Sequence, residues 1–259
     1  MEIKIIIGHK RPEFQIWPGY KFATLNPISN LDFEIEDNKQ LKESLPDGLI
    51  GEYYFLFLLR RKLEKFENLQ TVTICQYRRF VTSKPIGIRS ENQPYANIIT
   101  PEDASNLLIS NLIEPKKNGW LISSLFEVSQ SVTFQYAAHH ILRDWLRFLS
   151  DSYDAGLINQ NEVTEAGLTN LLIPAPSTGV FPAKILIEHL KRLENCAVAF
   201  KNTGYIQRDD YQRRVIGFCI ERLHSYFLLY SLANLKINFE DVSGQQIVVS
   251  ESISVKPTI

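Results

Sequence analysis

Residues 71–80 read TVTICQYRRF and predict the centre of the fold. The first five residues have high strand propensity, which favours a buried strand. An aromatic residue and two arginines follow at its end, Tyr77, Arg78 and Arg79. The strand would therefore hold a fixed pair of guanidinium groups at the edge of a sheet, where α/β folds bind their ligands.

The composition is typical of a soluble α/β protein. With 259 residues, 44% of them hydrophobic, the chain can bury the core of one large domain or of two unequal lobes. A formal net charge of −1 gives no electrostatic reason to expect a nucleic-acid partner. The three cysteines lie far apart in apolar segments, which indicates reduced thiols and neither a disulfide framework nor a zinc site. No stretch is apolar over the length of a signal peptide or a membrane span, so we expect a cytoplasmic protein with no integral membrane segment.

The first strand is predicted at residues 3–7, where four of five positions are apolar. His9 and Lys10 follow it, either as groups that meet a nucleotide or as part of a solvated loop. A long connection containing a helix then leads to the strand at residue 71. Such a unit places its two strands in parallel, so both should end at the same edge of the sheet.

That connection divides into two parts. Residues 12–47 are rich in proline and predict an irregular excursion, and a helix is expected from Leu49 to about Phe66. Glu52 lies in the first turn of this helix among aromatic residues. Its carboxylate either complements the helix dipole or contacts a ligand.

Residues 119–149 are expected to be largely helical. His140 and Asp144 are four residues apart and would share a helix face. The carboxylate could then orient the imidazole for acid/base chemistry, or both could line an acceptor pocket. A local hydrogen bond at the helix surface is the alternative.

The last long helix is predicted from Asp209 or Asp210 to about Leu232. Arg214, Gly217 and Glu221 fall within one narrow arc of it, beside an apolar stripe. A glycine inside a helix costs about 1 kcal/mol relative to alanine, and either a ligand or another backbone at close approach would explain it.

Two further segments give weaker patterns. Residues 171–173 predict a strand followed by a tight turn, and Pro182 opens a helix. The Ser-Thr-Gly run in that turn lacks the lysine of a phosphate-binding loop at the required spacing. From residue 236 the sequence alternates and predicts one or two edge strands or a loosely attached tail.

Four motifs together resemble a known family. They are Gly8-His9-Lys10, the aromatic helix led by Glu52, Gln76-Tyr77-Arg78-Arg79-Phe80, and the run from Tyr211 to Leu223, which contains Arg214, Gly217 and Glu221-Arg222-Leu223. In order and spacing, over residues 3–232, they resemble the glycosyltransferase-like domains of unknown function encoded in bacterial capsular polysaccharide and O-antigen clusters. Two departures stand out: Gln76 replaces a histidine of the family motif, and residues 177–181 replace an Asn-Met-Phe-Ile run.

The resemblance implies a nucleotide-sugar transferase of the GT-A type. The expected fold is a Rossmann-like α/β sandwich with a mixed, mostly parallel sheet, flanking helices and a helix-rich C-terminal half. The domain would span residues 1–235, with 236–259 as edge strands or tail. The implied activity is transfer of a sugar from a nucleotide diphosphate, with UDP-sugars favoured, to a saccharide or lipid-linked saccharide in surface polysaccharide synthesis. Such an enzyme would be cytoplasmic, and a place at the inner face of the membrane stays open.

Because arginines stand where many GT-A enzymes carry a metal-binding Asp-x-Asp motif, we expect guanidinium groups to neutralise the diphosphate, with no metal or other cofactor. The expected donor site is His9, Lys10, Glu52, Tyr77, Arg78 and Arg79. The expected acceptor or sugar site is His139, Arg214, Gly217 and Arg222. The catalytic candidates are Glu221, then Asp144 and His140.

The sequence leaves open the role of Glu221 and whether the protein is an active enzyme. Glu221 could be the catalytic base or the ligand of a sugar hydroxyl, or it could form a structural ion pair with Arg214. The chain could also be a catalytically silent protein of the same fold that binds nucleotide sugars or saccharides, and the loss of the motif histidine at Gln76 favours that hypothesis.

Overall fold

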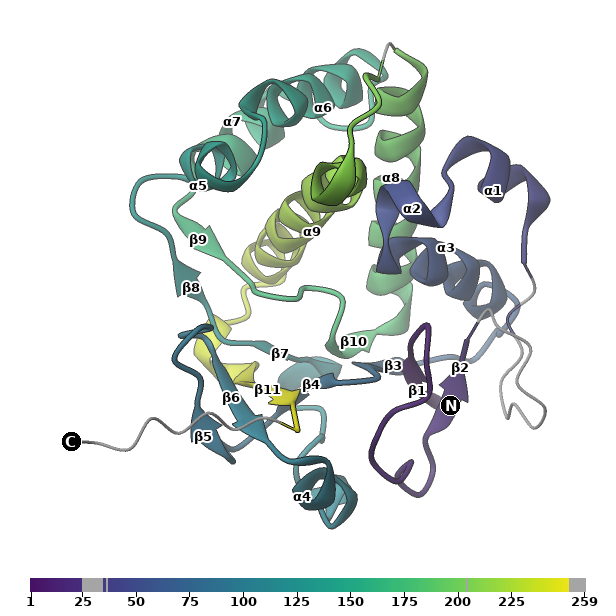
Figure 1. The fold of residues 1–259 in the computed structure, drawn as a ribbon, viewed down its shortest axis with the longest axis vertical. Helices are drawn as coiled ribbons and strands as arrows, with labels where there is room; N and C mark the ends of the chain where they lie inside the picture. Colours follow the sequence, from purple (N-terminus) through teal and green to yellow (C-terminus); the bar gives the residue numbers. More distant parts are fainter. Residues whose placement is uncertain (25–34, 36, 204, 252–259) are drawn as a thin grey trace.

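A computed structural model describes residues 1–24, 35, 37–203 and 205–251, and Figure 1 shows a mixed sheet with most helices on one side of it. The strands in the described residues are β1 (Glu2–Ile7), β2 (Lys21–Ala23), β3 (Thr71–Gln76), β4 (Arg79–Thr82), β5 (Ile88–Arg89), β6 (Ala96–Ile99), β7 (Leu121–Ser123), β8 (Phe126–Glu127), β9 (Leu171–Leu172), β10 (Gly179–Pro182) and β11 (Ser243–Val249). The helices are α1 (Lys39–Ser44), α2 (Asp47–Ile50), α3 (Glu52–Leu63), α4 (Pro101–Ser105), α5 (Val132–His139), α6 (Leu142–Asp154), α7 (Gln160–Leu168), α8 (Ala183–Asn202) and α9 (Val215–Asn234). Short 3-10 turns are η1 (Ile109–Asn111), η2 (Lys117–Gly119), η3 (Asp210–Arg214) and η4 (Phe239–Asp241).

The main sheet has the order β2-β1-β3-β10-β7-β11-β6-β5, with β4 beside β3 and β11. The predicted parallel pairing of the first and central strands is confirmed, from Glu2 opposite Thr71 to Ile7 opposite Gln76. Strand β10 runs antiparallel to β3 and β7, and β4 to β3 and β11. The sheet is therefore mixed as expected, whereas its mostly parallel character holds only for part of it.

Alternating side chains of β1 and β3 enter two different cores. Ile5 and Ile74 belong to the larger core under the helices, and Ile6 and Cys75 to a smaller one on the opposite face. This is the period of two that a strand imposes. Both faces of the central strands are covered, which accounts for their nearly continuous apolar sequence.

Trp17 anchors the smaller core. Its indole stacks on Phe14 at 4.8 Å between ring centroids, meets Phe80 edge-on at 4.9 Å, and donates a hydrogen bond of 2.8 Å to the carbonyl of Ala104. The β1–β2 connection and α4 are thereby fixed on the face of the sheet opposite the long helices, as Figure 1 shows.

Three expectations about elements need correction. The helix expected over Leu49–Phe66 is interrupted at Gly51, whose φ of 57° ends α2 and leaves α3 to begin at Glu52. The largely helical reading of residues 119–149 is wrong for its first part, where β7 and β8 occupy 121–127. The short strands there carry too few residues for a period of two to be recognised.

The C-terminal segment is the third correction. Strand β11 lies inside the main sheet, parallel to β6 and β7 and antiparallel to β4, and is not an edge strand or a tail. Ile247 is fully buried in the smaller core. Residues 252–259 of the predicted edge strands or tail lie outside the described residues. None of the helices that the structure describes is both long enough and apolar enough to cross a bilayer.

Candidate functional site

A cleft of about 610 Å³ opens where β1 and β3 end. Its walls come from residues 7–9 after β1, 47–55 of α2 and α3, 76–79 at the β3–β4 turn, and 211–221 of η3 and α9. Because β1 and β3 are parallel, their carboxyl ends meet at one edge, and this edge forms the floor of the cleft.

A carboxylate is fixed in this cleft by two neutral donors. The Nε2 of Gln76 donates to Oε2 of Glu52 at 2.6 Å, and the Oγ of Ser177 donates to Oε1 at 2.6 Å. The two donors also lie 3.3 Å from each other. The end of β3, the start of α3 and the turn before β10 therefore meet at Glu52, and both of its oxygens are occupied.

The pKa of Glu52 is raised. The main cause is loss of solvation, because protein surrounds the carboxyl group on most sides. The residue as a whole still contacts solvent through the cleft. The charge of Glu221 raises the pKa further, whereas the bond from Ser177, the charge of Arg79 and the bond from Gln76 lower it. The charge of Glu221 thus reaches Glu52 across the cleft.

Glu221 is the less constrained of the two. Its side chain is half-buried on α9, and within the described part of the chain it has neither a hydrogen bond nor an ion pair. The ion pair with Arg214 that the sequence allowed is not formed. The guanidinium of Arg214 instead lies over the rings of Tyr211 and Phe218, at 5.2 and 5.5 Å from their centroids.

Arg78 and Arg79 line the cleft from the tight β3–β4 turn, where Gln76 pairs with Arg79. Neither arginine forms an ion pair with a carboxylate among the described residues, and the buried Nε of Arg79 has no hydrogen-bond partner there. Arg78 lies over the ring of Tyr77 at 5.3 Å. Both guanidinium groups are therefore available to an anion.

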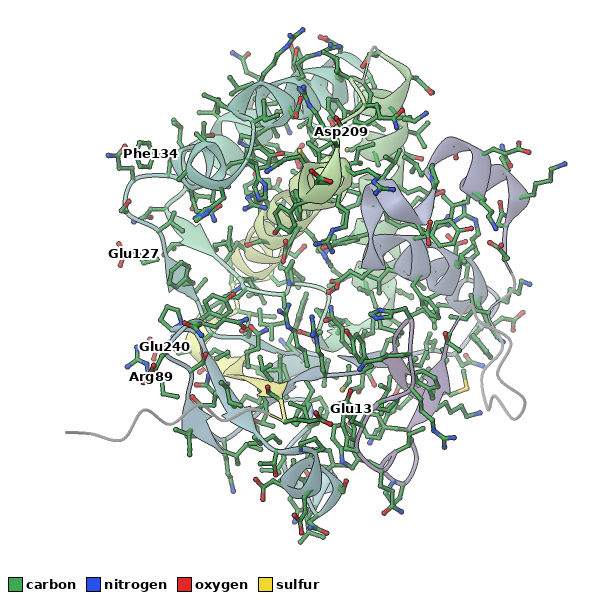
Figure 2. The ribbon with its side chains drawn as sticks, viewed as in Figure 1. Glu13, Arg89, Glu127, Phe134, Asp209 and Glu240 are labelled. Carbon is green, nitrogen blue, oxygen red and sulfur yellow. The ribbon has the colours of Figure 1, made fainter. Side chains whose placement is uncertain are left out.

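His9 and Lys10, the two residues expected to follow β1, line two different cavities. His9 lines the cleft and meets the ring of Tyr77 edge-on at 4.7 Å. Lys10 lies in an adjoining hollow of about 220 Å³ and forms an ion pair with Glu13. Glu13, labelled in Figure 2, lies in the β1–β2 connection below the sheet edge. Lys10 shares this hollow with Arg78, and both cations lie near the ring of Tyr77, whereas Arg79 lines the main cleft.

His140 and Asp144 do not share a helix face, and that expectation is wrong. Helix α5 ends at His139, and α6 begins at Leu142. Asp144 is buried and accepts two hydrogen bonds from Arg208, at 2.8 and 3.1 Å. Neither His140 nor Asp144 lines the cleft, so their assignment to acid/base chemistry gains no support.

Two residues expected to bind sugar also lie outside the cleft. Arg222 is buried, donates to Oε1 of Gln135 at 2.9 and 3.1 Å, and lies 4.9 Å from the ring centre of Tyr136. These contacts are those of a structural residue between α5 and α9. His139 is exposed at the end of α5, where its carbonyl accepts a hydrogen bond from Gln212.

Gly217 allows a close approach between two helices. A Cβ built at Gly217 would lie 2.9 Å from the carbonyl oxygen and 3.1 Å from the carbonyl carbon of Ile50, the last residue of α2. Of the two explanations that the sequence offered, a neighbouring backbone therefore accounts for this glycine.

Among the cleft residues that were not assigned a role from the sequence are Thr24, Asp47, Tyr211 and Phe218. A signal existed for Tyr211, because it precedes Arg214 by three residues at the start of the same motif. Phe218 was not among the residues of the predicted apolar stripe, and no pattern in the sequence marked it. No cluster of three or more His, Cys, Asp or Glu side chains that could hold a metal ion occurs in the described residues.

Comparison with known proteins yields one distant likeness in fold. No family model matches the sequence, and no curated protein matches it. The structure is similar to that of the WbbM bifunctional glycosyltransferase in its apo form, with a TM-score of 0.73 and 16% sequence identity. The likeness covers 96% of this chain and 46% of the other, so the chain spans about half the length of that protein.

Proposed function

We propose that this protein is a glycosyltransferase of bacterial surface polysaccharide synthesis. It moves a sugar from a nucleotide-diphosphate donor to a saccharide or lipid-linked saccharide acceptor, and UDP-sugars are the favoured donors. It would act in the cytoplasm or at the inner face of the membrane. One observation carries the proposal: a single cleft at the sheet edge gathers His9, Tyr77, Arg78 and Arg79 opposite Glu221. The fold shared with a glycosyltransferase of 16% identity supports it.

The two arginines would bind the diphosphate. A guanidinium group presents a planar set of donors that matches phosphate oxygens and stays charged at neutral pH. In a cleft partly shielded from water, two such groups can stabilise the charge that develops on the leaving diphosphate. The absence of a competing ion pair at Arg78 and Arg79, among the described residues, supports this role.

Glu221 would act on the acceptor hydroxyl. A general base needs a carboxylate that can reach the substrate, and Glu221 faces the cleft without a hydrogen bond to another described residue. Glu52 is less suited, since Gln76 and Ser177 occupy one oxygen each. We assign Glu52 the role of fixing the sheet edge and adding negative charge opposite the base.

A donor-hydrolysis and transfer assay with UDP-, GDP- and CDP-sugars tests the proposal. Arg78→Gln and Arg79→Gln should each lower kcat/KM by about 100-fold or more, the scale for losing one group that stabilises transition-state charge. Arg89→Gln, on the exposed edge strand β5 and outside the cleft lining, is the matched control and should behave as wild type. Activity lost with EDTA and restored by Mn²⁺ or Mg²⁺ would contradict the arginine assignment.

Glu221→Gln tests the base. The variant keeps the shape of the side chain, so we expect normal folding and donor binding but loss of transfer. A folded Glu221→Gln protein with wild-type turnover would remove Glu221 from the mechanism.

A catalytically silent binding protein is the second candidate. The observation that favours it is Gln76. Its amide cannot act as an acid or a base, and its Nε2 donates a hydrogen bond to Glu52 at 2.6 Å. Such a protein would gain thermal stability with a nucleotide sugar, because ligand binding stabilises the folded state, but would neither hydrolyse nor transfer it.

A further inference from the structure

Three aromatic rings pack against one another beside the cleft, and two of them, Tyr211 and Phe218, line it. Tyr211 is 58% exposed and lines the cleft. Its ring lies nearly parallel to that of His140, at 6.0 Å and 17°, and 4.8 Å from that of Phe218. His140 and Phe218 in turn stack at 4.1 Å and 22°. We call these three residues the aromatic platform.

The platform is held in place by neighbouring polar groups. Gln212 lies with its Oε1 3.3 Å from Nδ1 of His140, and its Nε2 donates to the carbonyl of His139 at 3.2 Å. The short η3 turn is therefore fastened to the end of α5. Asp209, labelled in Figure 2 at the start of this segment, precedes the turn. A binding surface that is already fixed loses little entropy when a ligand arrives.

The position of Tyr211 is unusual for a structural residue. A large ring with most of its area in solvent gains little from burial, yet here it is stacked and lies beside a charged group, Arg214. Glu221 lies on α9, about two turns after Arg214, and lines the same cleft. The wall formed by η3 and α9 therefore combines a flat apolar surface with a hydrogen-bond donor and an acceptor.

This combination suits a sugar ring. The C–H face of a pyranose is apolar and packs on an aromatic ring, while its hydroxyl groups accept from a guanidinium and donate to a carboxylate. A nucleobase also stacks on aromatic rings. A second aromatic pair in the cleft, His9 and Tyr77, stands beside the arginines at the sheet edge and suits the donor better.

We propose that the aromatic platform is an acceptor subsite that holds a pyranose ring against Tyr211, with Arg214 and Glu221 binding its hydroxyl groups. The inference rests on the proposed function, because it takes the sheet edge as the donor site. It adds the class of group that binds at the opposite wall, and it assigns Tyr211 as a residue that sets acceptor affinity.

The test measures sugar binding without turnover. Saturation-transfer NMR is recorded with methyl β-galactopyranoside, methyl α-glucopyranoside and methyl α-mannopyranoside on wild type, Tyr211→Ala, Tyr211→Phe and Tyr153→Ala. Tyr153 is 47% exposed on α6 and does not line the cleft, so its variant is the matched control. A thermal-shift titration with UDP on the same four proteins reports the donor site separately.

We expect signal transfer to the ring protons of at least one pyranoside in wild type, Tyr211→Phe and Tyr153→Ala. Tyr211→Ala should weaken binding about tenfold, the upper scale for one aromatic stacking contact, with the UDP shift unchanged. The inference is overturned if no pyranoside binds wild type, if Tyr211→Ala binds as wild type does, or if that variant loses the UDP shift and keeps the pyranoside. Failure of UDP to bind, with pyranoside binding intact, would count against the proposed function and leave the platform standing.

Discussion

Replacing Gly217 with alanine should destabilise the protein even though alanine is the better helix former. The new methyl group would lie 2.9 Å from the carbonyl oxygen of Ile50 and 3.1 Å from its carbonyl carbon. These are backbone atoms, and no rotamer change can move them away. Helices α2 and α9 must therefore separate, or α2 must shift.

The two opposing contributions can be compared. Alanine in a helix interior is favoured over glycine by about 1 kcal/mol. Inserting a methyl group into a closely packed contact typically costs about 1–3 kcal/mol. Because a rigid backbone receives this methyl group, we take the upper half of that range and expect a net loss of about 1–2 kcal/mol. In a chain of this size that lowers Tm by about 2–8 °C.

The measurement is urea unfolding together with Tm, for Gly217→Ala and for Gly48→Ala as the matched control. At Gly48, in α2, a Cβ would find its nearest atom 4.0 Å away, on Arg213. The control should be neutral or slightly more stable. If Gly217→Ala were as stable as wild type, the close approach of α2 would not be what requires glycine, and the reasoning would be refuted.

Three further predictions concern buried charges and thiols. Glu194→Ala should lower the free energy of unfolding by about 1–3 kcal/mol in urea, because the buried guanidinium of Arg60 loses its 2.9 Å partner and keeps only the carboxylate of Glu64, at 2.7 Å, whereas the exposed Glu43→Ala should cost at most about 0.5 kcal/mol. Burial lowers the pKa of His189 to about 3 and that of His224 well below its usual value, so the unfolded chain binds more protons below pH 6.5. The free energy of unfolding should therefore fall between pH 6.5 and 5, by up to about 1.4 kcal/mol per pH unit for each histidine, and a flat profile would contradict this. All three cysteines are buried, with raised pKa values, so a thiol reagent such as Ellman's should react only after unfolding.

The strands whose local sequence is decisive could be predicted, and those decided by distant partners could not. β1 and β3 each carry a run of apolar or β-branched residues, and the helix between them fixes their parallel pairing. Strand β10 has only four residues and begins with glycine, so its pattern is not recognisable alone. Its place is set by β3 on one side and β7 on the other.

The site divides along the same line. The positions of Arg78, Arg79 and His9 at the cleft could be predicted because these residues directly follow predicted strands, and α/β folds bind their ligands at the carboxyl ends of their strands. His140 and Asp144 could not, because their spacing suggests one helix face while the chain turns between them. Whether Arg222 faces the cleft or Gln135 depends on how α5 packs on α9, which no local pattern contains.

The contact at Gly217 also decides which side chains of α9 reach the cleft. Since the backbone of Ile50 touches α9 at Gly217, neither helix can rotate about this point without a clash. Arg214 precedes it by three residues and Glu221 follows by four, so both lie near the same face as the contact, one turn to either side. Gly217 leaves room for the backbone of α2, and Arg214 and Glu221, one turn before and one turn after it, line the cleft. A larger residue at 217 would widen the gap between α2 and α9 and move Glu221 away from the sheet edge. We therefore expect Gly217→Ala to reduce transfer more than donor binding, in contrast to a variant that only lowers stability.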